Sequence, residues 1–283
     1  MADRESTQVL RRSIPLDRTV RALGVVSLLN DFSSEVTVRT LPLFLSNVLG
    51  VRIGIIGLIE GVAESTATLF QLASGYLSDR IGRRKALTLC GYGLSNFTKP
   101  LLYFGTAGWG LVLAIRFLDR VGKGIRTAPR DALIADVTPP EQRGKAFGFR
   151  KAMDKTGAVM GLLAGAIVLY LSQRDSLTLT LETYLWLVLL AVLPGLASVV
   201  VLAGWVEERS KSVAAAGPIL GRPRVGGRFW AFIGVMVLFT LGNSSDAFLM
   251  LRAQTLGLSP VEIFLAVAAF NLVISLSSTK GGA

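Results

Sequence analysis

Long apolar runs separated by short basic segments constrain this 283-residue chain more than any other feature. Apolar residues make up 51% of the chain and charged residues 17%, whereas soluble domains carry about 25% charged residues. A helix needs roughly 20 mostly apolar residues to cross a bilayer, and in lipid it satisfies its own backbone polar groups. The sequence therefore predicts an all-α polytopic membrane protein.

About eight transmembrane helices are predicted from these runs. The candidate spans are Ala22–Ser46, Ile53–Ser78, Ala86–Phe104, Gly110–Thr127, Phe147–Leu171, Tyr184–Trp205, Phe229–Arg252 and Val261–Ser277. All four tryptophans lie at the ends of these spans. Tryptophan is enriched where a membrane meets water, so this placement agrees with the span assignment.

The basic residues alternate between loops. They concentrate before the first span, between the second and third, around the connection of the fourth and fifth, and between the sixth and seventh. The other loops carry few, and cytoplasmic loops are the ones that accumulate Lys and Arg. We therefore expect an integral protein of the cytoplasmic (inner or plasma) membrane with its N-terminus in the cytoplasm.

A polar stretch rich in Ala, Gly and Pro divides the chain into two parts. The expected domains are a cytoplasmic tail (1–21), a six-helix first half (22–205), a cytoplasmic linker (206–228) and a partial second half of two helices (229–283). A weak repeat supports this division, because NDFSSE at 30–35 is similar to GNSSD at 242–246. Parallel repeats of six helices are one known plan for transporters.

The composition excludes several classes of function. The chain has no histidine and one cysteine, Cys90, which excludes a Ser-His-Asp triad, a Cys-His dyad, a His-liganded metal and an internal disulfide. No phosphate-cradling loop is recognisable, so an enzyme is disfavoured. The net charge is +11, but the basic residues are split among loops, so nucleic acid is not an expected partner. The expected partners are a small-molecule substrate and the lipid bilayer, without cofactor or metal.

The loop after the second span carries the most specific motif. Residues 75–85 read GYLSDRIGRRK, which resembles the signature loop of the major facilitator superfamily, G-x-L-x-D-R-x-G-R-R-x. The resemblance covers roughly residues 20–278 and implies a gating role in which the aspartate helps to lock the two halves. The residues that match are Gly75, Asp79, Arg80, Gly82, Arg83 and Arg84. The alternative is that this loop is only a basic anchor that fixes topology.

The residues of this loop also have a physical interpretation. Gly75 allows a close approach of helices, and Gly82 permits a tight turn. Asp79 and Arg83 are four residues apart, so we expect them to form an ion pair.

The fourth span contains a partial motif. Arg116 and Gly122 are similar to the first and last defined positions of the family's R-x-x-Q-G-x-G, whereas Asp119 and Arg120 depart from it. In proton-coupled members the motif arginine is linked to coupling. The alternative is that Asp119 pairs within its helix with Arg116 or Lys123, at helical spacing.

The fifth span carries Gly157, Gly161 and Gly165. They resemble the antiporter motif G-x-x-x-G-P-x-x-G-G, although Leu162 replaces the proline. This resemblance favours export over import. The alternative is close helix packing through a face of small residues.

Charged residues within the first span point to a polar interior. Asp31, Glu35 and Arg39 share one helical face, and charges at this depth usually face a cavity or a partner. In the family, helices one, four, seven and ten line the central cavity. The resemblance therefore places near the substrate path Asp31, Glu35, Arg116, Asp119, Arg120, Asn243 and Asp246.

Two interpretations of these charges remain open. An intramembrane carboxylate can carry a proton, because desolvation opposes its ionisation. The alternative is a structural network built from Glu35–Arg39 and the pairs of Asp119. Glu60 and Glu64 in the second span are given less weight, because that span usually packs between the halves.

The expected function is a secondary active transporter of the major facilitator superfamily that exports a small molecule and uses a proton gradient. The alternative is a truncated, non-transporting membrane fragment or a regulatory partial transporter. Twelve spans need about 240 residues, and the second signature loop that the repeat predicts near the end of this chain does not appear. The sequence leaves the substrate, the coupling ion and the oligomeric state open.

Overall fold

The computed structural model describes residues 16–174, 176–208, 226–242 and 245–281. Within these ranges the chain is helical and forms no strand. The α-helices are α2 (Arg18–Asn47), α3 (Ile53–Ile81), α4 (Arg84–Thr98), α5 (Trp109–Val137), α6 (Arg143–Gln173), α7 (Leu181–Trp205), α8 (Gly227–Leu241), α9 (Asp246–Thr255) and α10 (Pro260–Gly281). Two 3₁₀ segments are η1 (Lys99–Ala107) and η2 (Pro140–Gln142).

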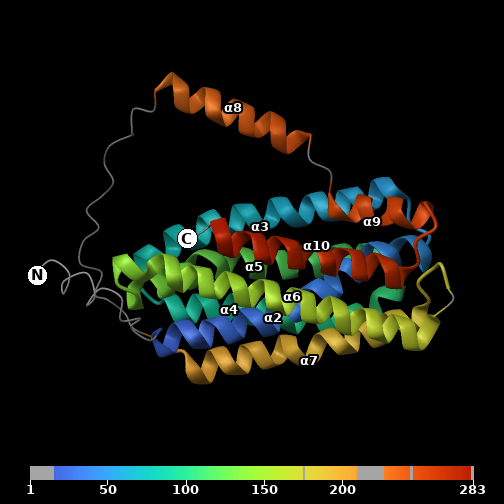
Figure 1. The fold of residues 1–283 in the computed structure, drawn as a ribbon, viewed down its shortest axis with the longest axis horizontal. Coiled ribbons are helices and arrows are strands. Elements are labelled where there is room, and N and C mark those ends of the chain that lie inside the picture. Colours follow the sequence, from blue (N-terminus) through green and yellow to red (C-terminus); the bar gives the residue numbers. More distant parts are fainter. Residues whose placement is uncertain (1–15, 175, 209–225, 243–244, 282–283) are drawn as a thin grey trace, which may run out of the picture.

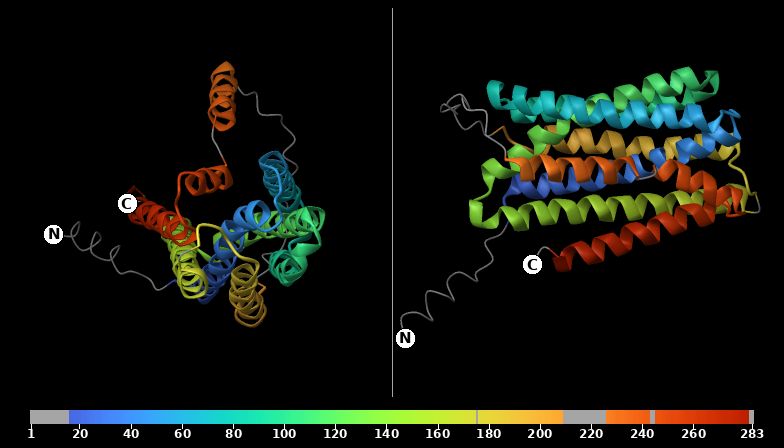
Figure 2. Two further views of the ribbon diagram at one scale, coloured as in Figure 1. Left: turned by 90° about the vertical axis from the view of Figure 1, so that its right-hand side faces the viewer. Right: turned by 90° about the horizontal axis from the view of Figure 1, so that it is seen from above.

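Most of these helices run along the long axis of one bundle (Figure 1). α2 packs against α6 and α7, α5 packs against α3 and α4, and α10 packs on α6. α9 contacts α2, α3 and α10. α8 lies apart from the bundle in Figure 1 and in the left view of Figure 2.

Helix length and hydropathy single out three helices of the described part as able to cross a membrane: Ile53–Ile81, Pro140–Gln173 and Leu181–Trp205. Gly227–Thr240 and Pro260–Ile274 are shorter apolar helices. α2 and α5 are long enough as well, but charged side chains interrupt their apolar character. The predicted total of eight spans remains a prediction.

The third predicted span is not α-helical throughout. α4 ends at Thr98, and the chain continues as the 3₁₀ segment η1. Pro100 lies at its start, where a proline ring would clash with the carbonyl of Asn96 in a continued α-helix. The polar side chain of Lys99 is placed at this change of helix type.

The seventh predicted span, Phe229–Arg252, is wrong as a single helix. α8 ends before Gly242, and α9 begins after Ser245, whose hydroxyl accepts a hydrogen bond from the N–H of Ala247 at 3.4 Å. Glycine disfavours a helix interior and serine favours an N-cap. The break therefore follows from local chemistry that hydropathy alone does not register.

The domain boundaries remain predictions, because the tail up to residue 15 and linker residues 209–225 lie outside the described residues. α2 to α7 correspond to the predicted six helices of the first half. α8 to α10 fall in the predicted partial second half.

Glycine brings α6 into direct backbone contact with α2. A Cβ atom on Gly157 would lie 2.1 Å from the carbonyl oxygen of Leu28, and one on Gly161 would lie 2.5 Å from that of Phe32. Gly165 faces the ring of Phe264 on α10. A face of small residues is thus required by the packing of α6, whatever further meaning its motif carries.

Candidate functional site

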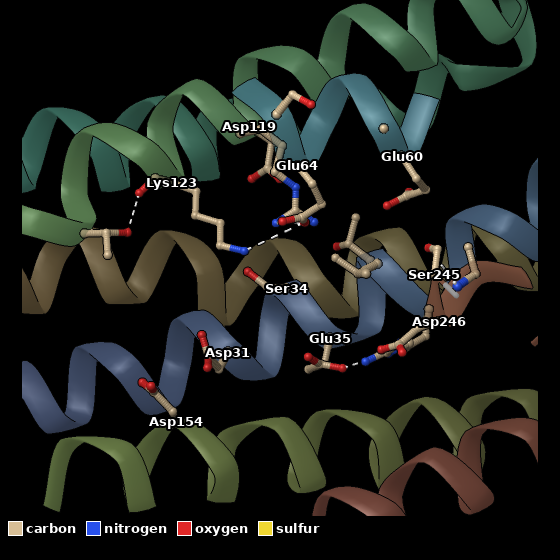
Figure 3. A pocket seen from close by; sticks show the side chains of 18 of the residues that line it. Asp31, Ser34, Glu35, Glu60, Glu64, Asp119, Lys123, Asp154, Ser245 and Asp246 are labelled. Atoms are coloured by element: carbon tan, nitrogen blue, oxygen red, sulfur yellow. Dashed lines mark hydrogen bonds and ion pairs between the residues drawn. The ribbon is translucent and has the colours of Figure 1, made fainter. Parts of the chain in front are cut away.

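A cavity of about 1120 Å³ lies between α2, α3, α5, α6 and α9. Figure 3 shows charged side chains from these helices reaching into it. The acidic residues that line it are Asp31, Glu35, Glu60, Glu64, Asp119, Asp154 and Asp246. The basic residues that line it are Arg39, Lys99, Arg120, Lys123, Arg126, Arg130, Arg150 and Lys151. Charge is therefore concentrated inside a bundle that is otherwise largely apolar.

The predicted cavity residues do not all reach this space. Asp31, Glu35, Asp119, Arg120 and Asp246 line it. Arg116 is only 1% exposed and does not itself line the cavity, but it contacts Glu60, which does; its role near the substrate path stays a prediction. Asn243 lies outside the described residues.

Arg116 is held by the neighbouring helix. Its Nη2 atom lies 2.8 Å from both carboxylate oxygens of Glu60 on α3. The predicted pair within α5 also forms, at the longer distance of 3.6 Å between Arg116 Nη1 and Asp119 Oδ2. The strongest partner of this arginine is therefore a residue that the sequence analysis weighted too low.

A second pair repeats this geometry one turn further along. Arg120 Nη1 lies 3.5 Å from Glu64 Oε1, so two acids on α3 meet two arginines on α5. The acids and the arginines share the same spacing of four residues. That matched spacing is the sequence signal that would have identified the pairs.

Asp119 lies between hydrogen-bond donors and cations. It accepts a hydrogen bond from the hydroxyl of Ser95 on α4. Its carboxylate also lies 3.8 Å from Arg120 Nε. Asp119 is thereby tied to α4 and, within its own helix, to Arg116 and Arg120.

Lys99 is a buried cation that the sequence analysis missed. It is 3% exposed, and its Nζ donates to the hydroxyls of Ser33 and Ser34 at 2.8 and 3.1 Å and to Asn96 Oδ1 at 2.8 Å. It forms no ion pair among the described residues. A lysine directly before a proline within an apolar run was the available signal.

Asn30 joins this polar group to α5. Its Oδ1 accepts hydrogen bonds from Asn96 Nδ2 at 3.2 Å and from Arg126 Nη1 at 3.0 Å. The guanidinium of Arg126 lies over the ring of Tyr92, 4.4 Å from its centre. Neutral amides and an aromatic face thus surround this arginine.

The two carboxylates predicted on α2 have different surroundings. Glu35 Oε2 lies 3.0 Å from Arg39 Nε, and Arg39 also contacts Asp246 on α9 at 2.7 Å. The predicted Glu35–Arg39 pair is therefore present. Asp31 accepts a hydrogen bond from Asn30 at 3.2 Å and forms no ion pair within the described ranges. Asp31 is the less constrained of the two acids.

The signature loop has its own set of contacts. Gly82 ends α3 with a φ of 72°, a conformation in which glycine is preferred. Asp79 pairs with Arg84 at 3.5 Å, rather than with the predicted Arg83. Arg84 also bonds to Asp136 and, at 3.2 Å, to the carbonyl of Ala132 on α5.

The other residues of this motif differ in exposure. A Cβ on Gly75 would meet Ala128 of α5 at 3.4 Å, which is a close approach. Arg80 and Arg83 are exposed. One arginine of the motif, Arg84, therefore connects the loop to the end of α5.

No group of acidic, cysteine or histidine side chains that could hold a metal ion occurs in the part of the chain that the structure describes. The polar groups of the cavity instead form ion pairs and hydrogen bonds across helices. Such an arrangement suits the passage of a polar or charged species.

Comparisons with known proteins agree with this architecture. The Major Facilitator Superfamily model matches residues 23–282. An uncharacterized MFS-type transporter of Methanocaldococcus jannaschii is 34% identical over 240 residues, which are 84% of this chain and 57% of that protein. The multidrug resistance protein MdtH of Aeromonas hydrophila is 30% identical over 121 residues, which are 43% of this chain and 30% of that protein.

A solved structure shares the fold. It is a bacterial homologue of the human drug peptide transporters PepT1 and PepT2, with a TM-score of 0.58 and 13% identity over 91% of this chain and 50% of its own. The chain spans 57% to 64% of the length of the curated relatives that it matches over more than four fifths of its own length.

Proposed function

Because the chain belongs to the Major Facilitator Superfamily, we propose that it acts in a secondary active transporter that exports a small molecule in exchange for protons. The observation that carries this proposal is the cavity of about 1120 Å³ with its inward-facing charges. Charged side chains inside a membrane bundle are costly and mark substrate or ion pathways. The cavity therefore serves as the substrate path.

Asp31 is the proposed carrier of the coupling proton. Glu35 is already held in an ion pair by Arg39 at 3.0 Å. Asp31 forms no such pair among the described residues, so its charge is less compensated. Arg116 acts on this site indirectly, through Asp119 on the cavity wall.

The proposed gate is the signature loop. Arg84 bridges Asp79 of the loop and Asp136 at the end of α5. Breaking this bridge would free the signature loop from the end of α5, while α3 and α5 stay joined through Glu60 and Arg116. The freed loop would then exchange partners as one half rocks against the other.

Export of amphiphilic compounds is the proposed direction and substrate class. The name of the multidrug resistance relative supports it, as does the partial antiporter motif with Gly157 and Gly161. The energy source is a proton gradient, and no further cofactor is proposed.

The proposed location is the cytoplasmic membrane, with the N-terminus and the loop after α3 facing the cytoplasm. The distribution of Lys and Arg supports this orientation. Cysteine labelling tests it in a Cys90→Ala background that carries Arg80→Cys. Labelling of position 80 from outside intact cells by an impermeant reagent would overturn the orientation.

The alternative function is that of a non-transporting or regulatory membrane fragment. Among the described helices of the second half, α9 provides most of the residues that line the cavity, and α8 contributes Thr240. α8 lies apart from the bundle (Figure 1). Alternating access needs one half to rock against the other around a midplane site, so this arrangement favours a requirement for further helices.

Reconstitution in liposomes tests both functions. The 283-residue chain is reconstituted in two forms. One is the chain alone, and the other is the chain co-expressed with the segment of the archaeal relative that has no counterpart in this chain. Uptake of a panel of amphiphilic cations and neutral drugs is then measured under a pH gradient. We expect saturable, gradient-dependent uptake in the co-expressed form, and Asp31→Asn should abolish it while exchange of substrate persists.

Two results would count against the proposal. If Asp31→Asn retained accumulation driven by the pH gradient, Asp31 would have a structural role. If neither form accumulated any compound although both were folded, the fragment alternative would stand.

A further inference from the structure

Two buried cations on the cavity wall, Lys99 and Arg126, have no carboxylate partner. Lys99 is 3% exposed and Arg126 is 6% exposed, and both line the cavity. Neither forms an ion pair with a residue that the structure describes. By contrast, the other two arginines of α5 that line the cavity, Arg120 and Arg130, each pair with an acid. Because a buried charge is costly unless it is paired, this part of the wall calls for a counter-charge.

Neutral side chains hold the two cations close together. Lys99 Nζ donates to Asn96 Oδ1 at 2.8 Å, and Asn96 Nδ2 donates to Asn30 Oδ1 at 3.2 Å. The same Asn30 oxygen accepts a hydrogen bond from Arg126 Nη1 at 3.0 Å. Two side-chain amides therefore join the cations, and they compensate neither charge.

Arg126 keeps donors that reach the cavity. A guanidinium carries five N–H groups, and Nη1 of Arg126 is the atom that bonds to Asn30. Its Nε and Nη2 form no hydrogen bond within the described residues, yet they are not fully enclosed, unlike the unpartnered Nε and Nη1 of Arg116. These groups can therefore donate to a species in the cavity.

Ser34 supplies a second donor beside Arg126. Its hydroxyl oxygen accepts from Lys99 Nζ at 3.1 Å and from Asn30 Nδ2 at 3.4 Å. A hydroxyl can donate while it accepts, and no described residue takes the hydrogen of this one. Figure 3 shows the side chain of Ser34 reaching into the cavity. Because Ser34 and Arg126 contact the two ends of one amide, that of Asn30, their donors lie close to each other.

The nearby acids leave one positive charge without a partner. Asp31 lines the cavity, accepts from Asn30 at 3.2 Å and forms no ion pair within the described ranges, so it can offset one of the two cations. Asp119 lies close to Arg116 and Arg120 and serves those arginines instead. One monovalent anion would offset the remaining charge.

We propose that Arg126, Ser34 and Lys99 bind a monovalent anionic group, which is a small inorganic anion such as chloride or the carboxylate of an organic compound. The guanidinium and the hydroxyl donate hydrogen bonds to the anion, and Lys99 acts on it as a point charge behind Ser34. Binding forms and breaks no covalent bond. The site does not depend on transport, whereas the identity of a bound carboxylate as cargo rests on the function proposed above.

Calorimetric titration of the purified 283-residue chain tests the site without any transport. The chain, in neutral detergent and dilute zwitterionic buffer at fixed pH, is titrated with sodium chloride, with sodium benzoate and with benzamide, the neutral counterpart of benzoate. We expect saturable binding of an anion and none of benzamide. Arg126→Gln and Lys99→Gln should each weaken it by about 10-fold or more, the loss expected for one charge-assisted hydrogen bond. Arg130→Gln is the matched control, because its cation already pairs with Asp131, and it should leave the affinity nearly unchanged.

The two anions distinguish the source of the ligand. Chloride that binds as tightly as benzoate assigns the site to an inorganic ion, and tighter binding of benzoate assigns it to a carboxylate; both results sustain the site. Circular dichroism verifies folding. If a glutamine variant does not fold, Ser34→Ala replaces it and should also weaken binding.

Three results would overturn the proposal. They are the absence of saturable anion binding to the folded wild type, undiminished binding in the folded variants at 99 and 126, and binding of benzamide as tight as that of benzoate. Anion binding with the expected behaviour alongside failed transport would sustain the site and reject the transport proposal. Transport by a chain that binds no anion would do the reverse.

Discussion

The six helices α2–α7 and the later helices α8–α10 are held by different kinds of contact. Within α2–α7, Arg116 and Glu60 form a buried ion pair, and Gly157 places α6 directly on the backbone of α2. α9 is joined to α2 by an ion pair whose acid, Asp246, is 62% exposed. The side chains of α8 whose exposure is described are all exposed except Ile233, which is half-buried. Ion pairs stabilise the first region from inside, whereas of the later helices α9 and α10 share its buried apolar core, α10 through Phe264.

This difference suggests where movement is possible. A buried pair penalises any displacement that leaves one charge alone, so α3 and α5 are expected to move together. An exposed pair exchanges its partner for water at small cost. The contact of α9 with α2 is therefore the weaker of the attachments between the two regions, whereas α10 is packed closely on α6.

Hydrogen exchange should show the largest contrast between the two regions. We expect amides of α8 to exchange on the order of 1,000-fold faster than those at the centres of α2 and α6, because local opening of an unpacked helix avoids the cost of global unfolding. Mass spectrometry of the 283-residue chain in detergent measures both. Equal protection of α8 and α6 would show that α8 is packed as firmly as the helices of the first region.

Loss of the buried ion pair should have the next largest effect. Glu60→Gln leaves Arg116 buried without its main counter-ion, and removal of one partner of a buried pair costs about 3–5 kcal/mol. Glu64→Gln is the matched control one turn away, since Glu64 is 60% exposed and its loss should cost less than about 1 kcal/mol. Denaturant unfolding followed by tryptophan fluorescence compares the two, and similar losses would contradict the assignment.

Gly157→Ala should destabilise the first region by about 1–3 kcal/mol, because the new methyl group collides with the carbonyl of Leu28. Gly148→Ala on the same helix meets nothing within 4 Å and should be neutral or gain up to about 1 kcal/mol from helix propensity. The shift of the unfolding midpoint provides the measurement. A tolerated alanine at 157 would mean that α2 and α6 are not in backbone contact.

Asp246→Asn should have the smallest effect on stability, below about 1 kcal/mol, because the acid is largely exposed. We expect faster hydrogen exchange in α9 and unchanged exchange in α6. Arg39 keeps its pair with Glu35, so the variant removes only the ion pair between α2 and α9. Loss of protection in α6 as well would show that the two regions are coupled more tightly.

Hydropathy predicted the apolar helices well, since α3, α6 and α7 cover the predicted second, fifth and sixth spans. Hydropathy did not predict the two helix interruptions at Pro100 and Gly242, which depend on the backbone properties of proline and glycine. Both residues sit within apolar runs, so an average over a window of about 20 residues hides them. Their effect is on hydrogen bonding and helix propensity, which hydropathy does not measure.

The sequence predicted those features of the candidate site that depend on residues of a single helix. The spacing of Asp31, Glu35 and Arg39 gave one face of α2, and the Glu35–Arg39 pair follows from that spacing. Lys99 and Asp154 were missed, because their importance arises from packing between helices far apart in sequence. The helical spacing of charges predicts neighbours along a helix and not partners across helices.

The contact of α6 with α2 at Gly157 has a mechanical consequence for the cavity. With no layer of side chains between the two backbones, this contact has little volume to compress or rearrange. The spacing of Asp31 and Asp154 is thus expected to stay constant while other helices rock. The wall of the cavity that α2 and α6 form together should therefore keep its shape when other helices are displaced.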